Sequence, residues 1–90
     1  MDKIQRGLQA DTLLENTLFR EVMNTLDEVY TATWRVAQTP EAREDCYRYV
    51  KLVEKLIVDI QSVANTGKIE QARVQELERG KKGFPWPKIA

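Results

Sequence analysis

Residues 40–66 repeat apolar side chains at alternating steps of four and three residues, which places them on one broad face of a helix. Thr39 offers a capping hydroxyl, Pro40 suits the first helical position, and Glu41 places an acid in the first turn. Gly67 belongs to the residue type that most readily ends a helix. We therefore expect a helix over 40–66, with an apolar face made of Ala42, Cys46, Tyr49, Val53, Leu56, Ile60 and Val63.

Residues 17–37 show the same pattern and predict a second long helix. Its apolar face consists of Phe19, Val22, Leu26, Val29, Thr33 and Val36, with Met23, Tyr30 and Ala37 beside it. A tight turn joins this helix to the next one, so the two faces can pack against each other. The sequence therefore predicts an all-α fold, an antiparallel helical hairpin of two long helices.

Shorter segments flank the predicted hairpin. Residues 69–79 have helical spacing and end before Gly80, which predicts a short third helix, and leucines near 8–15 predict a short helical turn. Residues 1–79 would form one helical domain, followed by an extended basic and aromatic tail over 80–90. A 90-residue chain buries only about 60–65% of its unfolded surface, so we expect the domain to be oligomeric.

Charge is distributed unevenly along the chain. All 14 acidic residues and 11 of the 14 basic residues lie in residues 1–79, which carry a formal charge of −3, and the tail carries +3. The single cysteine, Cys46, excludes an intramolecular disulfide and fits a reducing compartment. The N-terminus lacks the apolar core of a signal peptide, and no apolar run is long enough to cross a bilayer. We therefore expect a cytoplasmic protein that does not contact membranes.

Four large side chains lie off the two predicted apolar faces. A two-helix hairpin would leave them partly bare; they are Trp34, Tyr47, Leu52 and Val58. Either the short third helix and the N-terminal segment fold over them, or they form the interface of a homo-oligomer or of a complex with a partner.

The residue inventory argues against catalysis. The chain has no histidine, which removes imidazole acid–base chemistry, catalytic triads and imidazole metal sites. Ser62 has no imidazole to activate it, Cys46 belongs to the apolar face, and the acids near Glu41 are expected from the helix dipole alone. We expect no enzyme activity, no catalytic residues, no metal and no cofactor.

The tail, GKKGFPWPKIA, combines basic, aromatic and proline residues. Its partner-binding candidates are Lys81, Lys82, Phe84, Pro85, Trp86 and Pro87. The prolines stiffen the segment, so it loses less entropy on docking to another subunit or partner, or on folding back over its own chain. The alternative is a nucleic-acid-binding module, in which an oligomeric array of basic aromatic tails contacts single strands. The acidic body makes nucleic acid the less favoured partner.

Several single-residue markers resemble those of a family of short helical proteins of phages and prophages, whose function is unassigned. They are Leu13, Leu14, Phe19, Tyr30, Trp34, Ala42, Arg43, Glu44, Val63 and the corner Thr66, Gly67, Lys68 and Ile69. The resemblance covers residues 8–75 and excludes the tail. It implies a phage accessory or virion-assembly protein that acts in the host cytoplasm or in the virion, by binding itself or another phage structural protein.

Overall fold

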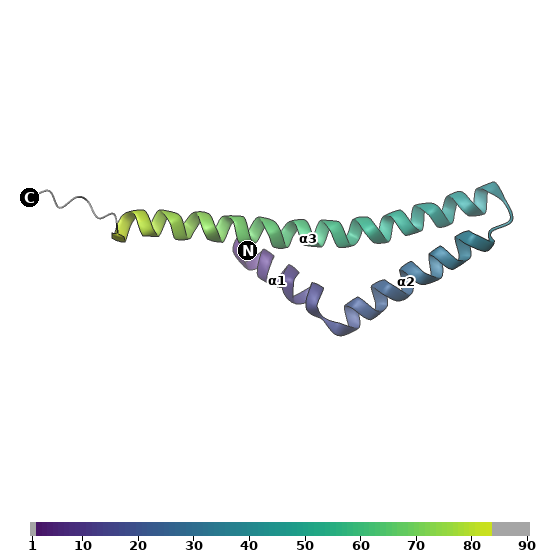
Figure 1. Cartoon of the computed structure of the whole chain (residues 1–90), viewed down its shortest axis with the longest axis horizontal. Helices are drawn as coiled ribbons and strands as arrows, with labels where there is room; N and C mark the ends of the chain where they lie inside the picture. The colour runs from purple at the N-terminus through teal and green to yellow at the C-terminus, as the bar shows by residue number, and fades with distance from the viewer. Residues whose placement is uncertain (1, 84–90) are drawn as a thin grey trace, which may run out of the picture.

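The computed structural model describes the backbone of residues 2–83 and the side chains of residues 2–80. Three helices account for nearly all of this part: α1 (Lys3–Glu15), α2 (Thr17–Val36) and α3 (Pro40–Gly83). The predicted all-α class is confirmed. In Figure 1, α3 runs as one long rod, α2 returns from the turn at its N-terminal end, and α1 leads back to its middle. The 44 residues of α3 span about 66 Å.

The predicted start of the second long helix, at Pro40, is confirmed. The hydroxyl of Thr39 accepts a hydrogen bond from the backbone N–H of Ala42 at 3.1 Å, which caps the first turn. The side chain of Arg43 donates a hydrogen bond from Nε to the carbonyl oxygen of Ala37 at 3.0 Å. This contact ties the start of α3 to the end of α2. The bounds of α2 also match the predicted 17–37 within one residue.

The predicted helix stop at Gly67 is wrong. The segments expected as separate helices over 40–66 and 69–79 are one continuous helix, which also runs through Gly80 to Gly83. No glycine in the described part has a positive φ angle, so neither Gly67 nor Gly80 adopts the left-handed conformation that ends helices. The start of the predicted extended tail, residues 80–83, is therefore helical.

Gly67 has a packing role, because α1 crosses α3 at this residue and meets it with Gly7. A Cβ atom placed on Gly67 would lie 2.7 Å from the Cα of Gly7 and 2.9 Å from the carbonyl oxygen of Lys3. Both distances are far shorter than ordinary van der Waals contacts. Two glycines thus allow the backbones of α1 and α3 to touch, and both are buried.

The N-terminal segment is longer than predicted, since the short turn near 8–15 is the 13-residue helix α1. Asp2 caps it by accepting a hydrogen bond from the N–H of Gln5 at 2.8 Å. Asn16 then separates α1 from α2, with an extended backbone (φ −66°, ψ 121°), and its side chain accepts a hydrogen bond from the N–H of Phe19 at 2.8 Å. One residue therefore ends α1 and starts α2.

The three helices enclose very little apolar core. In residues 2–80 the buried apolar side chains are only Ala10, Cys46 and Ala64, and no large side chain is fully buried. Both α1 and α2 contact α3, but α2 diverges from α3 as it approaches Asn16 (Figure 1). A hairpin of two helices packed along their whole length is therefore not confirmed.

Candidate interaction surface

The contact between α2 and α3 uses only one edge of each predicted apolar face. On α2, the half-buried side chains include Phe19, Met23, Leu26 and Tyr30, whereas Val22, Val29 and Val36 stay exposed. Tyr30 stacks on Tyr49 of α3, with ring centroids 5.0 Å apart and planes tilted by 37°. The prediction that Cys46 is a small packed side chain is confirmed. Each face is thus broader than the contact made inside one chain.

An apolar groove of about 190 Å³ runs along one side of this contact. Its lining residues, all apolar or aromatic, are Met23, Leu26, Tyr30, Tyr49, Leu52, Val53 and Leu56. No charged side chain lines the groove, so water gains little from occupying it. Such a groove suits apolar side chains.

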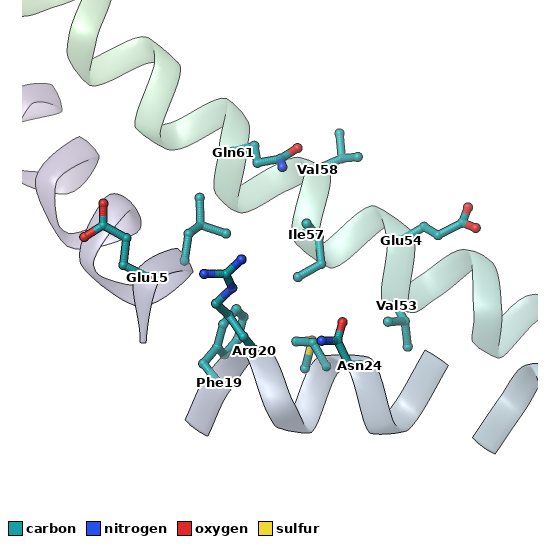
Figure 2. A pocket seen from close by; sticks show the side chains of 11 residues that line it. Glu15, Phe19, Arg20, Asn24, Val53, Glu54, Ile57, Val58 and Gln61 are labelled. Atoms are coloured by element: carbon teal, nitrogen blue, oxygen red, sulfur yellow. The ribbon is translucent and has the colours of Figure 1, made fainter. Parts of the chain in front are cut away.

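A larger groove of about 790 Å³ opens on the other side, where the junction of α1 and α2 bends away from α3. Its floor is apolar and includes Phe19 and Ile57, but its rim is polar. In Figure 2, Arg20 extends from α2 toward the space between α1 and α3, and Asn24 points toward α3. The polar residues of the rim on α1 and α3 are Glu15, Glu54 and Gln61, and Val58 also lines this groove.

The lining residues of the two grooves show which side chains lie on the same side of the α2–α3 pair. Met23 and Val53 line both grooves, so they lie on the line where α2 meets α3. Leu52 lines only the apolar groove and Val58 only the polar-rimmed one. These two residues are therefore on opposite sides of the α2–α3 pair.

The predicted oligomer-interface residues are all exposed, but the structure does not join them into one surface. Their exposed fractions are 44% for Trp34, 48% for Tyr47, 66% for Leu52 and 57% for Val58. Lys51 holds its ammonium 5.5 Å from the ring centroid of Tyr47, a cation–π contact that covers part of that ring. Leu52 and Val58 line different grooves.

Leu52 instead lies among residues that were assigned to the chain's own core. Val22 and Val29 lie four residues before and three after Leu26, so they flank the apolar groove on α2. On this side, the exposed large apolar residues of the two helices form what we call the apolar face: Val22, Val29 and Val36 of α2, with Tyr49, Leu52 and Leu56 of α3. The width of the apolar stripes was the sequence signal for this surface.

The predicted partner-binding tail falls mostly beyond the described part. Lys81 and Lys82 lie in the last turn of α3. Phe84, Pro85, Trp86 and Pro87 lie outside the described residues. Their predicted role stays a prediction.

The surface ion pairs follow helical spacing. Lys55–Asp59 and Glu44–Arg48, each four residues apart, form pairs at 2.7 Å and 3.6 Å, and both are exposed, so each contributes little stability. Between helices, Lys68 of α3 lies 3.8 Å from Asp11 of α1. Lys68 directly follows Gly67, so this ion pair joins α1 and α3 next to the glycine crossing.

Glu70, three residues past Gly67, has the most distinctive charge environment. Arg73 donates hydrogen bonds to both of its carboxylate oxygens, at 2.7 Å and 3.2 Å. These hydrogen bonds hold the pKa of Glu70 below its usual value; partial desolvation opposes them, and the charges of Arg73 and Lys3 add to them. The same pairing raises the pKa of Arg73. Lys3 lies in the first turn of α1, so its attraction for the Glu70 carboxylate is an electrostatic interaction between α1 and α3.

The described residues contain no group of three or more histidine, cysteine or acidic side chains placed to hold a metal ion. Within the same residues, none of the helices combines the length and apolar character needed to cross a bilayer. No family model, no curated protein and no solved structure matches the chain.

Proposed function

We propose that this protein is a non-enzymatic interaction protein, which assembles through exposed helical faces with copies of itself or with another protein. One observation carries the proposal. On the described helices, fourteen large apolar side chains are exposed while only three apolar side chains are buried. Scattered exposed apolar residues are normal, but a fold with almost no core of its own needs further apolar contacts.

In this proposal the α2–α3 pair is the working unit, a helical hairpin completed by association. The C-terminal segment, which includes Phe84 and Trp86, is a second contact that reaches a partner. The absence of histidine from the chain and the burial of Cys46 support a role without catalysis. The charge of −3 on residues 1–79 disfavours a nucleic-acid partner.

The phage resemblance extends the proposal to a virion-assembly or accessory role, with another phage structural protein as a partner. No match to a known family supports this extension. It stays a prediction that depends on the single-residue markers between residues 8 and 75.

Light scattering coupled to size exclusion tests the proposal on the purified chain. We expect a mass at least twice the 10.5 kDa of one chain at tens of micromolar. Acrylamide quenching of tryptophan emission is measured on the same sample. A folded 10.5 kDa monomer with both tryptophans shielded would contradict the proposal, because such a chain would satisfy its own apolar surface.

A further inference from the structure

We propose that the apolar face of α2 and α3 is covered by the same face of a second copy, so that two chains form a four-helix bundle. This inference rests on the proposed function and names its partner and its surface. There are two alternatives to this dimer. Two copies could associate through the polar-rimmed groove on the other side, or a different protein could cover the apolar face.

The position of the residues is the first argument. Leu52 and Leu56 line the apolar groove from α3, and Val22 and Val29 flank it on α2 through their spacing from Leu26. The exposed surface is therefore two helices wide. A second two-helix layer laid on it gives the usual packing of a four-helix bundle, whose core lies between the layers.

The area is the second argument. From their exposed fractions, the six residues of the apolar face leave roughly 600 Å² accessible per copy, so a pair that covered all of it would bury about 1,200 Å², the lower limit of stable specific interfaces. A patch of this size is at the top of the range found on ordinary monomers. One self-association is enough to cover it, without a further partner.

The chemistry of the surface is the third argument. The groove at its centre has no charged lining residue, so two copies can meet there without burying an unpaired charge. A twofold interface brings the same patch of both subunits together, which the uncharged lining of this groove allows; Arg48 and Lys55, one turn before and after Leu52, would lie at its edge. The opposite groove carries Arg20 and Glu54 on its rim, so the same pairing there would oppose like charges or desolvate them.

The test uses two matched substitutions on the full chain, Leu52→Asp on the apolar face and Val58→Asp on the other side. Light scattering measures mass over a dilution series, and circular dichroism checks that helix content is kept. A buried, unpaired carboxylate is costly, so Leu52→Asp should raise the dimer dissociation constant by about a hundredfold or more. Val58→Asp should leave it within about threefold, as expected for an exposed surface change.

If an aspartate substitution prevents folding, alanine substitutions at the same two positions provide a second test. Leu52→Ala should raise the dissociation constant by about tenfold, whereas Val58→Ala should leave it unchanged. An assembly that Val58→Asp weakens and Leu52→Asp does not would overturn the proposed surface and leave the interaction function standing. A folded wild-type monomer with exposed tryptophans would overturn self-association but not binding to another protein. A folded monomer with shielded tryptophans would overturn both.

Discussion

At the level of single residues, the contact between Gly7 and Gly67 decides how α1 lies on α3. A Cβ atom at either glycine would come within 2.7 Å of the other glycine's Cα, and backbone atoms cannot move aside as a flexible side chain can. Gly67 therefore cannot be read as a helix stop. It is the residue that permits two helix backbones to cross in direct contact.

Substitution of Gly67 by alanine should destabilise the protein. The added methyl group forces α1 away from α3, and overpacking of this kind costs about 1–3 kcal/mol, more than the helix propensity that alanine gains. Thermal unfolding followed by circular dichroism measures the change. Gly80→Ala is the matched control, because nothing lies within 4 Å of a Cβ at Gly80. That control should raise stability by up to about 1 kcal/mol. Equal effects of both substitutions would contradict the close crossing.

Glu70 gives a pH prediction. Its pKa is lowered in the folded chain by its hydrogen bonds to Arg73, so its stabilising contribution is full above the pKa of the unfolded state. The contribution is lost as pH falls through the lowered folded value. Carboxyl titration by NMR should show a higher midpoint for Glu70 in Arg73→Gln than in the wild type. An unchanged midpoint would show that Arg73 does not hold the carboxylate.

At the level of helices, Asn16 determines where α1 ends and α2 begins. Its side chain caps α2 through the N–H of Phe19, and its extended backbone interrupts the helical path. Asn16→Ala should therefore cost about 1 kcal/mol in unfolding free energy. Asn65→Ala, which replaces an exposed asparagine inside α3, should be neutral or slightly stabilising by chemical or thermal unfolding. A loss at position 65 as large as that at position 16 would argue against the cap.

The starts of α2 and α3 could be predicted from the sequence because their signals are local. Thr39, Pro40 and Glu41 act within one turn, and the structure has a helix that begins at Pro40. The break expected at Gly67 failed because glycine ends helices in one context and allows close packing in another. Only the position of Gly7, sixty residues earlier, separates the two meanings, and no local pattern reports it.

The candidate surface could be predicted only in part for a related reason. Periodicity identified the broad apolar stripes that contain Val22, Val29, Tyr49 and Leu56, but it assigned both edges of each stripe to the chain's own core. The structure leaves one edge of each stripe open. Leu52 and Val58 are both exposed, but they line different grooves of the helix pair. Which edge stays open depends on how α2 is rotated against α3.

At the level of the whole molecule, the chain completes its apolar packing by association in the proposed assembly. Association would affect the stability of the protein as well as its mass, because a fold whose core lies between copies gains stability as its concentration rises. In the proposed dimer, the apolar face of α2 and α3 is the contribution of one copy to the interface.

The concentration dependence of thermal unfolding tests this claim most directly. Circular dichroism of the full wild-type chain is recorded over a hundredfold range of protein concentration. Association should raise the midpoint by about 5 °C or more across that range, because the free energy of dissociation then contributes to unfolding. A cooperative transition with a midpoint that does not change with concentration would show that the chain folds alone and that association does not complete its core.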